Sequence, residues 1–258
     1  MHHKNKRKGE DKMRDYKKEL EHRVAFIQQL LKKTGASGIV FGNSGGKDSA
    51  LVGILCKKAC ENTIGVLLPC QSKRNFGIDL DDGKEVAEQF QIETRMVDLT
   101  ELKEVAMKSV ETATTLNKQA TANIAPRLRM MTLYAIAASE NLLVAGTGNR
   151  SERYVGYFTK WGDGGCDFNP ISDLTVKEVY EFLAYLDAPA AVREKAPSAG
   201  LFEGQTDEQE MGITYAAIDR YLLENEGVPE DLEKIQRMHT RSGHKLRMPA
   251  TYEDDYLK

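Results

Sequence analysis

Apolar residues alternate along the chain between short continuous runs and longer stretches with helical spacing. The short runs have the length and composition of strands, and they are 38–42 (GIVFG), 63–69 (TIGVLLP), 93–99 (ETRMVDL) and 141–149 (NLLVAGTGN). Helical spacing of the apolar residues predicts helices at 20–35, 50–55, 80–90, 100–109 and 117–140. Because strands that alternate with helices pair in parallel, the pattern predicts an α/β fold, a doubly wound parallel sheet with helices on both faces.

The pattern changes after Asn149. A Gly-rich stretch leads to a predicted helix at 175–186, the polar segment 196–209 is predicted to be a mobile loop, and two short helices and an irregular tail follow. Residues 1–15 are densely charged without apolar periodicity and are predicted to be a disordered extension. No linker rich in Pro, Gly or Ser divides the remainder, so 16–258 is predicted to be a single domain.

Composition and charge exclude several classes of protein. Of the 258 residues, 41% are hydrophobic and 29% charged, as is usual for a soluble globular protein. No apolar run approaches the roughly 20 residues that span a bilayer, so no membrane partner is expected. The absence of an apolar N-terminal segment predicts a cytoplasmic protein. A net charge of -3 argues against nucleic acid as a partner.

The four cysteines do not indicate a metal site. None of Cys56, Cys60, Cys70 and Cys166 belongs to a C-x-x-C pair, which argues against structural zinc. They are interpreted as small apolar residues kept reduced in the cytosol.

Residues 44–49 (SGGKDS) form a Gly-rich turn between a predicted strand and a predicted helix. In an open α/β sheet, ligands bind beyond the carboxyl ends of the strands, where this turn lies. Gly45 and Gly46 let the backbone approach a ligand closely and direct successive N–H groups at one anion, to which the helix adds its positive N-terminus. Ser44 and Ser49 supply hydroxyl donors, and Asp48 supplies a carboxylate that can hold a metal ion. The turn is therefore predicted to bind phosphate or pyrophosphate.

Two other phosphate-binding motifs do not fit this turn. A Walker A loop, G-x-x-x-x-G-K-[ST], requires Gly where Phe41 stands and Ser or Thr where Asp48 stands, and G-x-G-x-x-G is absent. The turn instead resembles S-G-G-x-D-S, the pyrophosphate loop of the ATP pyrophosphatase superfamily, whose adenine-nucleotide alpha hydrolase-like members cleave ATP between the α and β phosphates and form adenylates. This resemblance implies ATP contacts at Gly42, Asn43, Ser44, Gly45, Gly46, Lys47, Asp48 and Ser49.

Three further segments resemble those of the ammonia-dependent NAD synthetases. They are 123–130 (NIAPRLRM), 146–152 (GTGNRSE) and 156–167 (GYFTKWGDGGCD), and the resemblance extends over about 24–256. It implies that the carboxylate of deamido-NAD attacks the α-phosphate of ATP, with release of pyrophosphate, and that ammonia then displaces AMP from the acyl adenylate. ATP is then a co-substrate and Mg²⁺ the implied cofactor.

The same resemblance assigns roles to individual residues. Asp48 and Glu152 are the expected magnesium ligands and, together with Asp167, the expected catalytic residues. Further expected ATP contacts are Thr147, Lys177 and Ser198, and expected deamido-NAD contacts are Arg127, Lys160, Asp167, His244 and Lys245. One departure weakens the assignment of Lys177, because the lysine position of the family matches Val176, and one step along a helix turns a side chain by about 100°.

The resemblance also implies a homodimer in which deamido-NAD binds near the interface. The apolar residues of 117–140 are spread widely around the predicted helix, so either the sheet or a second subunit can cover them. The chain has no room for the amidase domain of glutamine-using relatives, which predicts direct use of ammonia and leaves a separate glutaminase partner open. The alternatives are a tRNA-modifying adenylating enzyme and a non-catalytic adenine-nucleotide-binding protein.

Overall fold

The computed structural model describes residues 14–71, 77–194 and 206–252. The strands are β1 (Gly38–Gly42), β2 (Thr63–Leu67), β3 (Glu93–Met96) and β4 (Leu142–Ala145). The helices are α1 (Tyr16–Thr34), α2 (Lys47–Ala59), α3 (Ile78–Gln89), α4 (Thr100–Glu111), α5 (Lys118–Ala122), α6 (Ile124–Glu140), α7 (Arg150–Val155), α8 (Val176–Tyr185), α9 (Ala190–Glu194), α10 (Asp207–Met211), α11 (Tyr215–Glu224) and α12 (Pro229–Ser242), followed by the 3-10 turn η1 (Gly243–Lys245).

The four strands form one parallel sheet in the order β3-β2-β1-β4. The chain proceeds outward from β1 through β2 to β3 and then returns to the other side of β1 to form β4. The strand order therefore reverses between β1 and β4, which is the place where open α/β sheets bind their ligands. All four predicted strands and the parallel pairing are confirmed. β2, β3 and β4 end at Leu67, Met96 and Ala145, before the ends of the predicted runs at residues 69, 99 and 149.

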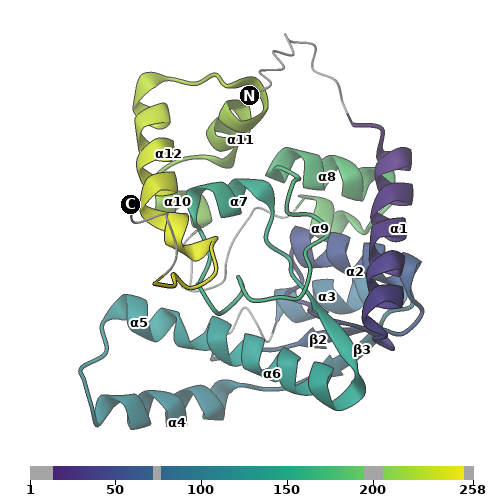
Figure 1. Ribbon diagram of the computed structural model, residues 1–258, viewed down its shortest axis with the longest axis horizontal. Coiled ribbons are helices and arrows are strands. Elements are labelled where there is room, and N and C mark those ends of the chain that lie inside the picture. Colours follow the sequence, from purple (N-terminus) through teal and green to yellow (C-terminus); the bar gives the residue numbers. More distant parts are fainter. Residues whose placement is uncertain (1–13, 72–76, 195–205, 253–258) are drawn as a thin grey trace.

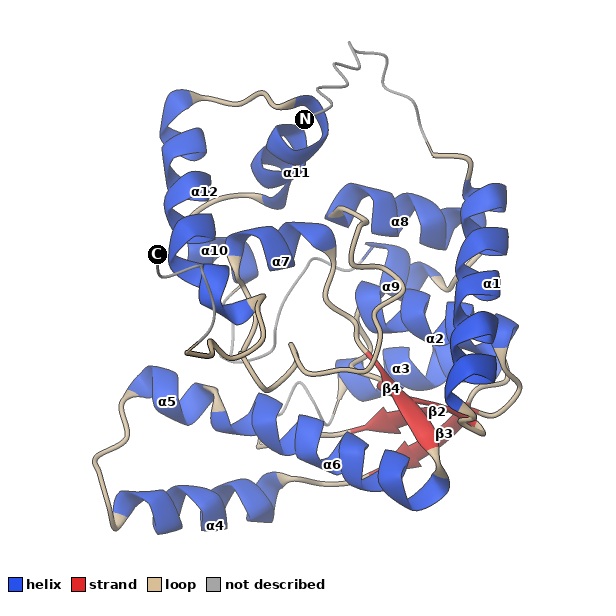
Figure 2. Cartoon of the chain, viewed as in Figure 1, coloured by secondary structure: helices blue, strands red, loops and turns tan. Residues whose placement is uncertain are grey.

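Helices cover both faces of the sheet, as predicted (Figures 1 and 2). Successive residues of β1 point to opposite faces, so that Ile39 and Phe41 join the core beneath α1, α2 and α8, whereas Val40 joins the core beneath α6. The first core is the larger of the two. α2 lies at its centre because its apolar residues occur on most sides of the helix, as expected of an element packed between a sheet and other helices.

The predicted helix at 117–140 is wrong in one respect, because Asn123 interrupts it and separates α5 from α6. The side chain of Asn123 accepts a hydrogen bond from the hydroxyl of Thr159, at 2.7 Å, in the 156–167 segment. Pro126 lies in the first turn of α6, the one part of a helix that tolerates its missing N–H. The break is thus tied to a contact with a distant part of the chain.

Two other predictions need correction at their boundaries. Of the predicted disordered extension, residues 1–13 lie outside the described residues, but Arg14 forms an ion pair with Glu178 at 2.6 Å and Asp15 caps α1. Of the predicted mobile loop at 196–209, residues 196–205 lie outside the described residues, whereas Asp207 begins the helix α10.

The C-terminal helices form a third apolar cluster beside the sheet. α7, α10, α11 and α12 contribute Val155, Met211, Ile218 and Ile235 to it, and Figure 1 shows these helices next to one another on the side away from α4 and α6. Among the described helices, none combines the length and the apolar character needed to cross a membrane.

Candidate active site

One residue of the loop after β1 has a backbone conformation that only glycine adopts without strain. Gly45 has a φ of +68°, and a Cβ atom added there would lie 1.9 Å from the backbone oxygen of Asp79. Asn43 supports the loop from within, because its side chain accepts from the N–H of Gly45 and donates to the carbonyl of Gly83. The hydroxyls of Ser44 and Ser49 lie 3.1 Å apart. The predicted phosphate loop is thus a rigid turn at the N-terminus of α2.

Asp48 and Glu152, which are 104 positions apart in the sequence, meet through Asn149. The side-chain NH₂ of Asn149 donates to Oδ1 of Asp48 at 3.1 Å, and its backbone N–H donates to Oε2 of Glu152 at 3.3 Å. Asn149 and Glu152 also form a capping box at the start of α7, where the side-chain oxygen of Asn149 accepts from the N–H of Glu152. The two carboxylates expected to bind metal are therefore brought together.

Lys47 lies between these two carboxylates. Its Nζ is 2.6 Å from Oδ2 of Asp48 and 3.8 Å from Oε1 of Glu152. Burial lowers the pKa of Lys47, but the charges of Asp48 and Glu152 outweigh this effect and raise it above its ordinary value. Burial, together with the charge of Asp48, raises the pKa of Glu152. Two carboxylates in a poorly solvated site thus depend on a cation between them.

These residues line a cleft of about 620 Å³ at the carboxyl ends of β1 and β4, a size typical of sites for small-molecule ligands. Every residue of 42–49 except Gly45 lines it. Thr147, Glu152 and, from the segment 156–167, residues 156–159, 162, 163 and 165 line it as well. Its described charged residues are six carboxylates (Asp48, Asp79, Glu152, Asp163, Asp207 and Glu210) and four cations (Lys47, Lys118, Arg129 and Lys245). An anionic ligand in this cleft therefore requires additional positive charge.

The three remaining expected ATP contacts have different outcomes. Thr147 lines the cleft, whereas Lys177 is half exposed on α8 and its Nζ lies 3.9 Å from Glu181. At the neighbouring position, which matches the lysine of the family, Val176 is buried in the third apolar cluster. Neither Val176 nor Lys177 is among the described residues that line the cleft, and Ser198 lies outside the described residues.

The expected deamido-NAD contacts fall into two groups. Lys245 lines the cleft, where its Nζ donates to the carbonyls of Gly156 and Phe158. The other four expected contacts, Arg127, Lys160, Asp167 and His244, are not among the described residues that line the cleft. Arg127 is exposed on α6 and donates to the carbonyl of Lys160, whose own Nζ lies 5.4 Å from the ring centroid of Trp161. Asp167 accepts from the hydroxyl of Tyr134, and His244 is exposed.

Several described residues of the cleft were not predicted. Arg129 lines the cleft and donates to the carbonyl of Leu68, and burial lowers its pKa. Side chains two positions apart on a helix differ in direction by about 200°, so Arg127 and Arg129 point to nearly opposite sides of α6. Asp207 and Glu210 reach the cleft from α10, where they accept from the hydroxyl of Tyr157.

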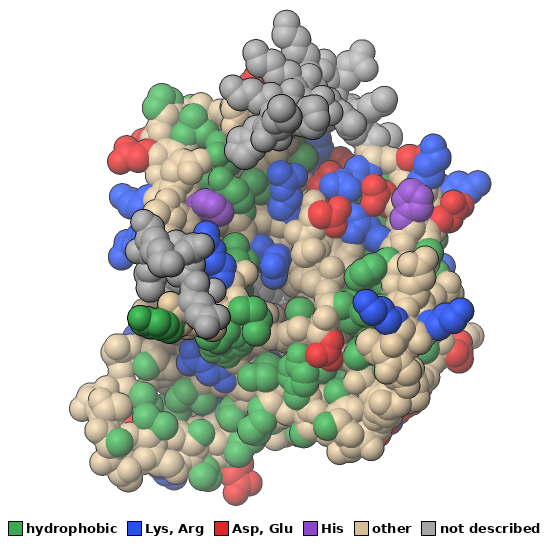
Figure 3. All heavy atoms as spheres, in the orientation of Figure 1, with side chains coloured by type: hydrophobic (Ala, Val, Ile, Leu, Met, Phe, Trp, Pro, Cys, Tyr) green, Lys and Arg blue, Asp and Glu red, His purple; other side chains and the backbone are tan. Residues whose placement is uncertain are grey.

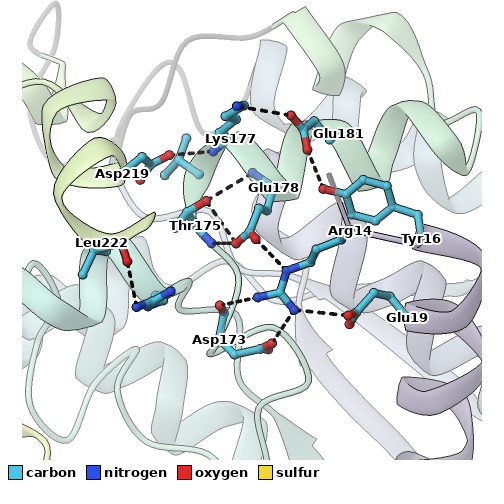
Figure 4. Close-up of polar contacts among 12 residues, drawn as sticks. Arg14, Tyr16, Glu19, Asp173, Thr175, Lys177, Glu178, Glu181, Asp219 and Leu222 are labelled. Atoms are coloured by element: carbon cyan, nitrogen blue, oxygen red, sulfur yellow. Dashed lines mark hydrogen bonds and ion pairs between the residues drawn. The ribbon is translucent and has the colours of Figure 1, made fainter. Parts of the chain in front are cut away.

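A polar network behind the cleft joins α7, α8 and α11. The buried carboxylate of Asp219 accepts from the hydroxyl of Ser151, which precedes Glu152, and from the backbone N–H of Lys177 at 2.8 Å (Figure 4). The same view shows Arg14 joining Glu19, Asp173 and Glu178 at the edge of α8. The contact between Ser151 and Asp219 ties α7 to α11 at the residue next to Glu152.

Asn149→Ala tests the link between the two carboxylates. We expect this variant to lose about 2 kcal/mol of unfolding free energy, because both a helix cap and a hydrogen-bond partner of the partly buried Asp48 disappear. Asn117→Ala, which removes only the exposed cap of α5, should cost about 1 kcal/mol or less. Urea denaturation measures both, and equal losses would contradict a bridging role for Asn149.

A parallel sheet with a Gly-rich turn before a helix at its switch point is typical of α/β nucleotide-binding proteins. A family model described as NAD synthase matches residues 19–249. The NH(3)-dependent NAD(+) synthetase of Carboxydothermus hydrogenoformans is 47% identical over 238 residues, which cover 91% of this chain and 97% of the relative. That of Archaeoglobus fulgidus is 43% identical over 241 residues, covering 91% and 96%. The chain therefore belongs to the NAD synthase family.

Solved structures agree with this assignment. The NMN synthetase of Francisella tularensis has a TM-score of 0.88 and 36% sequence identity, covering 93% of this chain and 100% of that chain. The NH3-dependent NAD synthetase of Campylobacter jejuni, in complex with the nitrate ion, has a TM-score of 0.76 and 31% identity, with the same coverage.

Proposed function

We propose that this protein is an ATP-dependent ligase that converts deamido-NAD to NAD with ammonia, releasing AMP and pyrophosphate. The observation that carries the proposal is the convergence of Asp48, Glu152 and the 44–49 turn in a cleft that is also lined by residues 156–159, 162, 163 and 165. Relatives named NH(3)-dependent NAD(+) synthetases match nearly the whole chain, which supports ammonia as the nitrogen donor.

The residues of the cleft suit this chemistry. The nicotinate carboxylate attacks the α-phosphorus of ATP, the bond to the β-phosphate bridging oxygen breaks, and ammonia then displaces AMP from the acyl adenylate. The N–H groups of the 44–49 turn and the N-terminus of α2 hold the departing pyrophosphate. Arg129 and Lys245 supply positive charge along the cleft wall. Fixed donors of this kind stabilise charge that develops on the phosphates.

Asp48 and Glu152 fit a magnesium ion. Magnesium in nucleotide sites is bound by one or two carboxylates, with water and phosphate oxygens completing an octahedron. No group of three or more His, Cys, Asp or Glu side chains within the described ranges could hold a metal by itself, which agrees with a site completed by ATP. The ion, when bound, would neutralise the pyrophosphate leaving group.

The decisive test is an assay of amide formation with purified protein, ATP, Mg²⁺, deamido-NAD and either ammonium or glutamine. We expect NAD, AMP and pyrophosphate in equal amounts with ammonium and none with glutamine. Pyrophosphate release with tRNA instead of deamido-NAD would favour a tRNA-modifying enzyme. ATP binding without any release would indicate a non-catalytic nucleotide-binding protein.

A second candidate substrate is the mononucleotide. The NMN synthetase with a TM-score of 0.88 is the specific observation in its favour, and nicotinate mononucleotide carries the same carboxylate as deamido-NAD. Competition between the two substrates in the same assay decides between them: the substrate with the higher kcat/KM is the one that the cleft recognises.

We further propose a homodimer that completes the deamido-NAD site. Arg127, Met131 and Tyr134 share one face of α6, since they lie four and three residues apart. Met131 is 49% exposed, and Leu102, Val105 and Val110 of the neighbouring α4 are also exposed. Figure 3 shows hydrophobic side chains gathered over this part of the surface. An apolar patch next to substrate-binding residues favours burial against a second copy.

Met131→Glu should separate the dimer, because a buried carboxylate without a partner opposes association. We expect light scattering to give a monomer and the KM for deamido-NAD to rise about tenfold or more, with the affinity for ATP nearly unchanged. Val228→Glu is the matched control, since Val228 is 56% exposed at the start of α12, away from α4 and α6. A wild-type protein that is already monomeric would refute the dimer.

A further inference from the structure

The oxygens of Asp48 and Glu152 are divided between two partners. Asn149 holds one oxygen of each, Oδ1 of Asp48 and Oε2 of Glu152. The other two oxygens, Oδ2 and Oε1, both lie near Nζ of Lys47, at 2.6 and 3.8 Å. Two carboxylates from different elements thus present one oxygen each to a single cation, and that cation belongs to the protein.

The surroundings of Lys47 keep its ammonium at this place. The side chain is 6% exposed, and Nζ lies 6.0 Å from the ring centroid of Tyr180 and 5.7 Å from that of Tyr215. Both aromatic faces favour a cation at these distances. An ammonium this poorly solvated is held by its two carboxylates. Lys57 on the same helix contrasts with it, because its partner Glu61 is 91% exposed.

The ammonium and a divalent ion cannot both occupy this place. Magnesium binds carboxylate oxygens at about 2.1 Å, so an ion on Oδ2 of Asp48 would lie within about 5 Å of an ammonium that remained 2.6 Å from the same oxygen. Repulsion at that separation is large in a poorly solvated site. The four-carbon stem of Lys47 gives its ammonium room to move when another anion is offered.

We infer that Lys47 competes with the divalent ion for Asp48 and Glu152. Before ligand binds, the ammonium of Lys47 holds the two carboxylates together, and when the nucleotide binds, this ammonium moves to the phosphates. This inference rests on the proposed function, from which it takes the metal site. Its consequence is that the metal alone binds weakly, whereas the metal and the nucleotide bind well together, because the phosphates of the nucleotide accept the displaced ammonium.

The test is a pair of titrations in which the inference requires opposite changes. Mn²⁺ alone is titrated into the whole protein by electron paramagnetic resonance, and an ATP analogue with a methylene bridge between the α and β phosphates is titrated by calorimetry at saturating Mn²⁺. Lys47→Met should bind Mn²⁺ alone about tenfold more tightly and the analogue about tenfold more weakly. A purely structural lysine would weaken both, and unchanged or weaker Mn²⁺ binding overturns the inference.

Matched variants separate charge from folding. Lys57→Met removes an ion pair from the same helix and should change neither titration. Lys47→Gln serves as the neutral variant if Lys47→Met does not fold, and Lys47→Arg, which keeps the charge, should bind Mn²⁺ alone as wild type does. The Mn²⁺ titration requires neither deamido-NAD nor turnover. It therefore tests the role of Lys47 separately from the amide-formation assay, which tests the proposed function.

Discussion

We expect the Asp48→Asn protein to fold but to form NAD at least about 10³-fold more slowly than wild type. The substitution changes the volume of the side chain very little and keeps an oxygen that can accept from Asn149 or Lys47. It removes a negative charge that the proposed magnesium site requires. The loss should therefore appear in kcat, measured by steady-state assay with ammonium and deamido-NAD, while circular dichroism remains that of the wild type.

The control for Asp48→Asn is a loss of the same charge elsewhere. Asp98 is exposed, and its side chain accepts from the N–H of Thr100, the first residue of α4, at 2.8 Å. Asp98→Asn should retain nearly full activity. Addition of excess Mg²⁺ should not rescue Asp48→Asn, because a ligand is missing rather than merely weakened. Wild-type kcat in this variant would remove Asp48 from the metal site.

The fold could be predicted from the sequence where local pattern and long-range packing agree. β1, the 44–49 turn and α2 are adjacent in the sequence, and the apolar run, the two glycines and the apolar helix each specify their own element. The order of the strands is different, because nothing in the periodicity of 141–149 says that β4 pairs with β1 rather than β3. The meeting of Asp48 with Glu152 follows from that pairing.

Some features that were missed had signals in the sequence. Asn149 and Glu152 at N-x-x-E spacing predict the capping box that begins α7, and Thr206 and Gln209 predict the one that begins α10. Pro126 predicts a helix beginning a few residues before it. By contrast, the ammonium of Lys47 lies between carboxylates from two elements, and no spacing within the sequence predicts that position.

The glycines of the phosphate turn give the second large expected effect. At Gly45, φ is +68°, and an added Cβ would lie 1.9 Å from the backbone oxygen of Asp79, which cannot move without displacing the start of α3. At Gly46, φ is -99°, and the nearest atom to an added Cβ is the hydroxyl of Ser44, at 3.3 Å. Neighbouring glycines therefore differ in what a methyl group would cost.

Gly45→Ala should lower the unfolding free energy by about 3 kcal/mol or more, since backbone strain and a collision with main chain add together. Gly46→Ala should lower it by less than about 1 kcal/mol. Thermal and urea unfolding of both variants measure this difference without any ligand. ATP binding should fall at least about 100-fold in Gly45→Ala, because a turn that relaxes away from a φ of +68° no longer directs its N–H groups at one anion. Equal unfolding free energies for the two variants would mean that the turn does not depend on Gly45.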